Sequence, residues 1–243
     1  MSKKNRIRIY VETDLKENTE VVCDEKQAHY LLNVMRLKIG DEVYAFDGKN
    51  GEFCCHIANV GKKNCVLRVE QKFCDFFESP DLWLLFAILK KDNTDLVVEK
   101  ATEIGVKKIV PVITDYTSNS KPRIERLKTL VVEASEQSRR QDLPQVEECI
   151  TLKELLEMWD KSRKLIYLDE SLSAKSAIEQ MPKCESPAAI LVGPEGGFSQ
   201  KELEILRSLD YSYGVSLGKN ILRAETAIVA ALSLWQALAG NWQ

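Results

Sequence analysis

The sequence lacks the residues from which several common kinds of site are built. It contains only two histidines, His29 and His56, both in the first quarter of the chain, so neither a histidine-rich metal site nor a serine-type triad is expected. Its seven cysteines form no Cys-x-x-Cys pair, and their odd number argues against a disulfide framework. We therefore expect reduced thiols and chemistry that needs no metal.

Long apolar runs and strong net charge are also missing. No apolar stretch approaches the roughly 20 residues of a membrane helix, and the first residues carry no apolar segment that could act as a secretory signal. The net charge of −3 does not by itself indicate nucleic-acid binding. We expect a cytoplasmic protein with no membrane partner, and 243 residues suffice for one large or two modest domains.

Glycines concentrate in two loops of the last quarter. The apolar run 188–192 leads into Gly-Pro-Glu-Gly-Gly at 193–197, and a short β-type run, 214–217, leads into the loop 218–226. We expect the two loops to leave neighbouring strand ends of an α/β sheet, where ligands bind. A tight strand-to-helix connection without a ligand is the alternative. The spacing matches neither the dinucleotide fingerprint nor a phosphate loop, so the cofactor should be a different one.

The hydrophobic pattern divides the chain near residue 75. Residues 1–74 alternate short β-type runs with turn signals around one helical segment at 25–35, which predicts a small β-barrel. Residues 80–243 alternate strand and helix patterns, which predicts a parallel sheet covered by helices. The expected strands are 6–11, 42–46, 53–60, 65–70, 82–89, 108–113, 164–168, 188–192 and 211–217, and the later helices are 93–104, 123–139, 152–159, 200–209 and 225–239.

The two loop motifs resemble those of a known family. Residues 191–197, together with 217–218 and 222–227, are similar to the RsmE family, the 16S ribosomal RNA uracil-N3 methyltransferases of the SPOUT superfamily. Shorter matches lie at 34–37, 99–106 and 133–137. The resemblance implies a SPOUT-type α/β fold with a C-terminal trefoil knot and an N-terminal PUA-like RNA-binding barrel. It also implies S-adenosylmethionine as cofactor, a homodimer, and uridine 1498 of 16S rRNA in the small ribosomal subunit as target.

The same resemblance suggests which residues form the site. We expect Arg223 to stabilise the uracil anion and either Glu225 or Glu195 to take the proton, while Arg140 keeps its place in the family pattern as a further catalytic candidate. The N-terminal domain holds 13 Lys/Arg against 11 Asp/Glu, a net of +2. Its RNA-binding candidates are Arg6, Arg8 and Arg36. The expected cofactor-binding residues are Leu191, Gly193, Gly197, Leu217, Gly218, Ile221 and Leu222.

The chain departs from the family pattern at one of these loops. The family usually has Gly-Pro-Arg where this sequence has Gly-Lys-Asn at 218–220, and Ala224 stands where threonine is common. A single-residue mechanism is therefore not carried over. Three alternatives stay open: a structural ion pair between Arg223 and Glu225, a SPOUT enzyme acting on another RNA position, and a non-catalytic RNA-binding protein.

Overall fold

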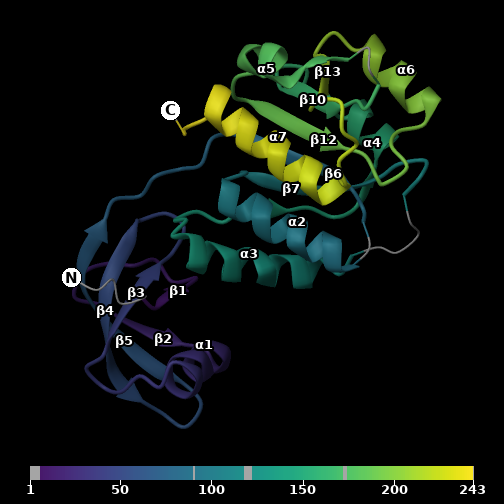
Figure 1. Ribbon diagram of the computed structural model, residues 1–243. Helices are drawn as coiled ribbons and strands as arrows, with labels where there is room; N and C mark the ends of the chain where they lie inside the picture. The colour runs from purple at the N-terminus through teal and green to yellow at the C-terminus, as the bar shows by residue number, and fades with distance from the viewer. Residues whose placement is uncertain (1–5, 90, 118–121, 172–173, 243) are drawn as a thin grey trace. The chain divides into compact units, whose positions relative to one another are not determined.

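The computed structural model describes residues 6–89, 91–117, 122–171 and 174–242, which belong to two compact units (Figure 1). Unit 1 comprises residues 1–78 and 135–143, and unit 2 comprises residues 79–134 and 144–243. The segment 135–143 thus packs with the N-terminal unit, which a division along the sequence does not anticipate. Within the described ranges, no helix has the length and apolar character needed to cross a membrane.

Unit 1 is built on a five-stranded sheet in the order β1-β3-β4-β5-β2, antiparallel except for the β1–β3 pair. Strands β1 and β2 lie at its two edges, and no ladder between described residues joins them into the closed barrel that the sequence predicts. The strand β2 was not expected, because its four residues are too few to show a period. The strands are β1 (Arg8–Tyr10), β2 (Glu20–Cys23), β3 (Glu42–Phe46), β4 (Glu52–Val60) and β5 (Cys65–Cys74).

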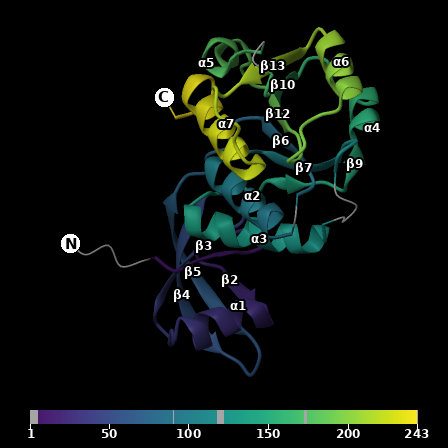
Figure 2. The ribbon, with the colours of Figure 1, turned by 45° about the vertical axis from the view of Figure 1, so that its right-hand side comes forward.

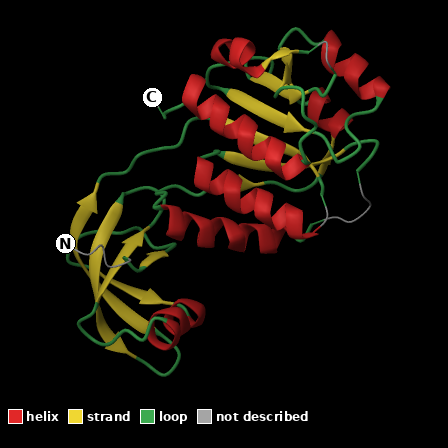
Figure 3. Ribbon diagram, in the orientation of Figure 1, coloured by secondary structure: helices red, strands yellow, loops and turns green. Residues whose placement is uncertain are grey.

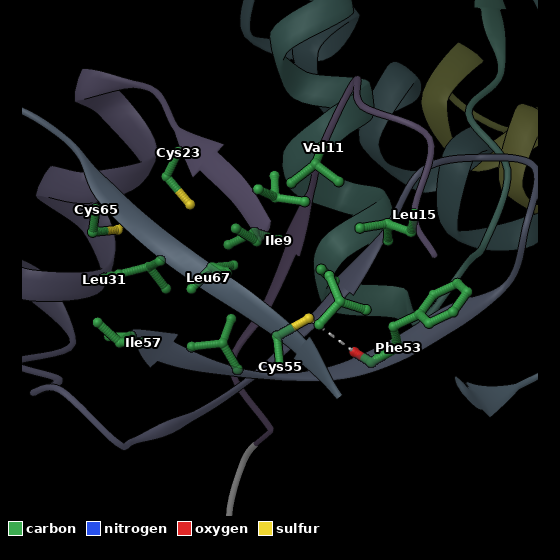
Figure 4. Close-up of a cluster of buried hydrophobic side chains, with 14 of the residues drawn as sticks. Ile9, Val11, Leu15, Cys23, Leu31, Phe53, Cys55, Ile57, Cys65 and Leu67 are labelled. Carbon is green, nitrogen blue, oxygen red and sulfur yellow. Dashed lines mark hydrogen bonds between the residues drawn. The ribbon is translucent and has the colours of Figure 1, made fainter. Parts of the chain in front are cut away.

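The core of unit 1 holds three of the cysteines. Cys23, Cys55 and Cys65 are fully buried among aliphatic side chains (Figure 4), and burial raises the pKa of Cys55 to about 12. These thiols are packing groups, as reduced buried cysteines usually are. The helix expected at 25–35 is divided: α1 (Glu25–His29) has α geometry, and Tyr30–Val34 is a π-helix.

Unit 2 contains one parallel sheet, in the order β11-β13-β10-β12-β6-β7-β8, with β9 also paired to β7. This confirms the predicted parallel sheet, and Figure 3 shows it between its helices. Strands β8, β9 and β11 have two residues each, too short for a sequence period. The strands are β6 (Leu82–Ala87), β7 (Lys108–Ile113), β8 (Gln145–Val146), β9 (Ile150–Thr151), β10 (Lys164–Leu168), β11 (Lys175–Ser176), β12 (Ala188–Val192) and β13 (Ser212–Ser216).

Helices cover both faces of this sheet. Helices α2 and α7 pack against each other on one side, and α4 and α6 lie on the other (Figure 2). On the α7 side, the indole of the fully buried Trp235 donates to the carbonyl oxygen of Cys184 at 2.7 Å. The helices are α2 (Lys91–Ile104), α3 (Ile124–Ser138, shared between the units), α4 (Leu152–Glu157), α5 (Ala177–Gln180), α6 (Gln200–Ser208) and α7 (Ala224–Leu238), with a 3₁₀ turn at Met181–Lys183.

The strand order corrects one expectation about the two glycine loops. The strands that lead into them, β12 and β13, are not neighbours, because β10 lies between them and pairs with both. After β12 the chain passes through α6 and reaches the far side of β10 before it forms β13. The carboxyl ends of three adjacent strands, rather than two, therefore meet at one edge of the sheet.

Candidate cofactor-binding site

A pocket opens at the carboxyl ends of β10, β12 and β13, where ligands bind in open parallel sheets. One loop follows each strand, and the start of α7 completes the wall. Glycines and apolar side chains make up most of the lining, and the ionisable residues in it are Asp169, Glu170, Glu195 and Lys219. The other described lining residues are Leu168, Val192, Gly193, Pro194, Gly197, Phe198, Leu203, Val215, Ser216, Leu217, Gly218, Asn220, Ile221, Leu222, Ala224 and Ala227.

The loop after β12 is tightly packed at its glycines. A Cβ at Gly193 would lie 3.2 Å from the ring of Phe198, closer than most real contacts. Gly197 has φ of +70°, and a Cβ there would lie 2.9 Å from Glu170 Oε1. Ser199 then caps α6 in a capping box with Glu202. The fold of the loop itself therefore favours glycine at both positions.

The loop after β10 was missed by sequence reasoning. Asp169 is 6% exposed, and its carboxylate accepts hydrogen bonds from the Ser171 N–H at 2.8 Å and from Arg207 at 3.0 Å. Burial alone raises the pKa of Asp169, but these hydrogen bonds outweigh burial and hold the pKa below its ordinary value. Glu170 follows and is exposed. A signal was present, since the strand 164–168 is predicted correctly and ends directly before two carboxylates.

The pocket brings together most of the expected cofactor-binding residues. Six of the seven line it, namely Gly193, Gly197, Leu217, Gly218, Ile221 and Leu222. Leu191 is the exception, because it lies fully buried inside β12, between Tyr167 of β10 and Leu85 of β6. Its backbone pairs with both neighbouring strands and its side chain lies in the core, so Leu191 supports the strand that leads into the pocket. Which of the six lining residues touch a cofactor stays a prediction.

The first turn of α7 places two of the catalytic candidates. Arg223 is the N-cap residue; its side chain is exposed and forms no hydrogen bond or ion pair with any described residue. Glu225 lies in the first turn, where its Oε2 accepts from Asn93 at 3.5 Å. In the described part of the chain, Arg223 and Glu225 therefore do not form the ion pair that was considered as an alternative. The third candidate, Glu195, is exposed and lines the pocket.

The fourth candidate, Arg140, lies in unit 1 and is 5% exposed. Its guanidinium binds the carboxylate of Asp142, with nitrogen–oxygen distances of 2.9 Å. It is not among the described residues that line the pocket. Burial and pairing favour a structural role for Arg140, and a part in catalysis stays a prediction.

Arg8, an expected RNA-binding residue, is buried and paired. It is 4% exposed: its guanidinium pairs with Glu52 at 2.8 Å and donates to the carbonyl oxygens of Ser135 and Arg140 at 2.7 and 2.8 Å. Burial lowers the pKa of Arg8, while Glu52 opposes the shift, and the ordinary value is high enough that the group stays charged near neutral pH. A phosphate could reach Arg8 only by breaking these bonds. Burial and pairing favour a structural role for Arg8 in unit 1, and RNA binding by Arg8 stays a prediction.

The other two RNA-binding candidates are accessible. Arg6 is exposed and stacks on Phe73, with its guanidinium carbon 4.3 Å from the ring centroid. Arg36 is exposed and has φ of 58°, two residues after the end of the π-helix. Left-handed backbone in a non-glycine residue and π-helical turns are both frequent at functional sites.

Among the residues that the structure describes, no three His, Cys, Asp or Glu side chains gather as a metal ion would need.

Comparisons with known proteins agree with this arrangement. Residues 77–236 match the family described as an RNA methyltransferase domain, and residues 23–70 match the RNA methyltransferase PUA domain. Ribosomal RNA small subunit methyltransferase E of Rickettsia conorii is 36% identical over 93% of each chain. The crystal structure of the Neisseria gonorrhoeae protein of that name, bound to S-adenosyl methionine, aligns over 98% of this chain and all of the other, with a TM-score of 0.89 and 27% identity. A putative methyltransferase of Legionella pneumophila, also with S-adenosylmethionine, aligns over 97% and 99%, with a TM-score of 0.87 and 28% identity.

Proposed function

Because this chain belongs to the RNA methyltransferase family, we propose that it methylates N3 of a uridine in 16S rRNA of the small ribosomal subunit, at uridine 1498 in rRNA numbering. It is an S-adenosylmethionine-dependent rRNA methyltransferase, as its relatives are. The observation that carries the proposal is the pocket at three adjacent strand ends, in a chain that aligns almost completely with a relative holding that cofactor. An rRNA substrate also implies action in the cytoplasm.

The lining of the pocket fits this cofactor. Leu217, Ile221 and Leu222 offer apolar surface to an adenine ring, and the glycine turns allow close approach of the backbone. The sulfonium is a cation, and Glu170 and Glu195 place carboxylates in the same lining, whereas the charge of Asp169 is already balanced by Arg207. When bound, the cofactor supplies a methyl group that is already activated. The protein's task is to orient the uracil and make its N3 nucleophilic.

Arg223 suits the second part of that task. Loss of the N3 proton spreads negative charge onto the uracil carbonyl oxygens, and a guanidinium aimed at one of them stabilises the anion as an oxyanion donor does. One such donor is worth about 3–4 kcal/mol. Arg223 flanks the pocket between Leu222 and Ala224 and forms no bond to a described residue that would have to be broken first.

Two carboxylates are candidates for accepting the proton. Glu195 lies in the pocket wall, and Glu225 lies one helical position beyond the N-terminus of α7. Separate Glu195→Gln and Glu225→Gln variants show which carboxylate accepts the proton. Replacing the acceptor should slow methyl transfer about a hundredfold, within the range for general bases, and leave cofactor binding normal.

We also infer the trefoil knot and the homodimer. From β12 the chain crosses β10 to form β13, and α7 then returns onto β12 and α2. A trefoil knot requires a crossing of this kind. Leu96 of α2 and Val229 of α7 are 40% and 36% exposed in the same helical layer, which suits a surface that meets a second copy. Light scattering of the purified chain, with Val229→Glu as the disrupting variant, tests the dimer.

The product nucleoside tests the function. The purified protein is incubated with labelled S-adenosylmethionine and with small-subunit particles whose 16S rRNA lacks the methyl group. The RNA is then digested to nucleosides, which are identified by mass spectrometry. We expect 3-methyluridine from one site. A ribose-methylated product or another base would contradict the N3 assignment, and no incorporation with normal cofactor binding would favour a non-catalytic RNA-binding protein.

Cofactor binding has its own test in a pair of glycine variants. Gly193→Val should weaken S-adenosylmethionine binding at least about tenfold, because a Cβ at Gly193 crowds Phe198 and closes the loop toward the ligand. Gly196→Ala is the control in the same loop: the atoms nearest to its Cβ would be those of Tyr116, at an ordinary 3.7 Å. Calorimetry measures both. Equal affinities in the two variants would remove the cofactor from this loop.

A further inference from the structure

The turn that follows β7 holds an aromatic side chain out in solvent. Thr114 and Thr117 close the turn: the N–H of Thr117 donates to the carbonyl of Thr114 at 3.1 Å, and the Thr117 hydroxyl accepts from the N–H of Thr114 at 2.8 Å. Tyr116, between them, is 59% exposed and makes no hydrogen bond or ring contact with a described residue. The backbone that carries this ring is therefore held by hydrogen bonds, although more than half of the ring's residue is exposed.

The same turn is bonded to the cofactor loop. The N–H of Asp115 donates to Glu202 Oε1 at 2.9 Å, and the Asp115 carboxylate accepts from the hydroxyl of Ser199, the N-cap of α6. Glu202 is 7% exposed and also accepts from the Ser199 N–H at 2.8 Å. These bonds hold the turn after β7 against the end of the glycine loop. Tyr116 consequently has a definite position with respect to the pocket.

That position is beside the pocket but outside it. A Cβ at Gly196 would lie 3.7 Å from the Tyr116 ring, and the neighbours of Gly196 on both sides, Glu195 and Gly197, line the pocket. Tyr116 itself is not among the described lining residues. The Tyr116 ring lies at the rim of the pocket that would hold the methyl donor, and much of its surface is exposed. It is therefore suited to contact the base that accepts the methyl group rather than the cofactor that donates it.

We propose that Tyr116 is a substrate-positioning residue on which the acceptor base stacks. An unpaired base that is turned out for modification exposes both π-faces, and aromatic side chains are the usual groups that receive it. This inference rests on the proposed function, because it takes the acceptor to be a nucleobase of RNA. It assigns Tyr116 to RNA and not to the cofactor, and the ring rather than the hydroxyl carries the role.

Three variants separate these roles. Tyr116→Ala should lower kcat/KM for small-subunit particles at least about tenfold, since loss of a stacking aromatic costs about that much or more. Tyr116→Phe should keep nearly full activity, because the ring is retained. Met158→Ala, which removes another exposed apolar side chain of unit 2, is the matched control and should match wild type. Affinity for S-adenosylmethionine and the melting temperature should be unchanged in all three variants.

Three outcomes would overturn the assignment, two from these variants and one from cross-linking. Normal kcat/KM in Tyr116→Ala would remove the ring from substrate binding, and a loss of cofactor affinity equal to the loss of activity would make Tyr116 a support for the glycine loop. Ultraviolet cross-linking of wild type to RNA carrying 5-iodouridine at the acceptor position gives a readout that needs no methyl transfer. A cross-link at Tyr116 supports the proposal even if the methylated atom is not N3, and its absence opposes the proposal even if N3 is confirmed.

Discussion

Arginine has opposite surroundings in the two units. In unit 1, Arg8 and Arg140 are almost fully buried, and each guanidinium binds a carboxylate and backbone carbonyl oxygens. In unit 2, Arg223 is exposed between the lining residues Leu222 and Ala224, and its guanidinium bonds to no described residue. Arg8 was suggested by the basic excess of the N-terminal residues, and Arg140 and Arg223 by the family resemblance. Neither observation distinguishes the buried residues from the exposed one, whereas the structure does.

The difference shows how a fold divides charged residues between support and chemistry. A buried guanidinium is costly to desolvate, so it is tolerated only when its donors are satisfied, and it then has none left for a ligand. An exposed guanidinium at a pocket rim keeps its hydration until a ligand replaces it. Four predictions test this contrast, in order of decreasing expected effect.

Loss of Arg8 should destabilise the protein most. Arg8→Met leaves Glu52, itself 4% exposed, as an unpaired buried charge, which should lower the free energy of unfolding by about 3–5 kcal/mol. Urea unfolding measures this loss. Arg6→Met is the control, because Arg6 is exposed and a surface change of that kind should cost within about 0.5 kcal/mol. In the double variant Arg8→Met with Glu52→Leu, part of the stability should return; equal stability of Arg6→Met and Arg8→Met would erase the contrast.

Loss of Arg223 should affect rate and not stability. Arg223→Ala should slow methyl transfer at least a hundredfold, about 2.7 kcal/mol, with little change in S-adenosylmethionine affinity, because the interaction is made mainly in the transition state. Single-turnover kinetics and calorimetry measure the two quantities. Raising the pH should partly restore the rate, since more of the uridine is then already deprotonated. A parallel loss of cofactor affinity, or a large drop in melting temperature, would return Arg223 to a structural role.

The exposed arginines of unit 1 should affect RNA binding by salt-dependent attraction. Replacing Arg6 and Arg36 with alanine should weaken binding to small-subunit particles several-fold and reduce the slope of log K against log salt by about 1 per lost phosphate contact. Filter binding over a salt series measures both. Arg126→Ala is the control, because Arg126 is an exposed arginine of unit 2 that already pairs with Asp95. An unchanged slope in the double variant would exclude Arg6 and Arg36 from phosphate contact.

The smallest effect is expected at Asp169, where the carboxylate is held by Ser171 and Arg207. Its folded pKa lies below the ordinary value, so its stabilisation is complete above the unfolded pKa of about 3.9 and is lost as the pH falls through the folded pKa. Asp169→Asn should lower the melting temperature by about 2–4 °C near pH 6, for roughly 1 kcal/mol. This gap should narrow as the pH falls below the unfolded pKa and close once the pH is below the folded pKa. The exposed Asp210→Asn should show no such gap, and a gap at Asp169 that persists at low pH would contradict the assignment.

Much of unit 2 could be predicted from the sequence because its elements are long and strongly patterned. Strands 108–113, 164–168 and 188–192 have the predicted limits, and five helices lie within about two residues of expectation. The two-residue strands were missed, since a period cannot be read from two positions. At the π-helix Tyr30–Val34, the apolar pattern predicts a helix but does not distinguish its hydrogen-bonding class.

The sequence by itself determined the parallel sheet, the two glycine loops and most of the pocket wall, because glycine turns and buried strands follow from local chemistry. Only the tertiary structure decided that β10 separates β12 and β13, so that Asp169 and Glu170 join the site. It also decided that Arg8 is buried while Arg223 is exposed. Strand order and burial depend on contacts between residues far apart in the chain: Arg8 meets Ser135 and Arg140, which no local pattern of residues specifies.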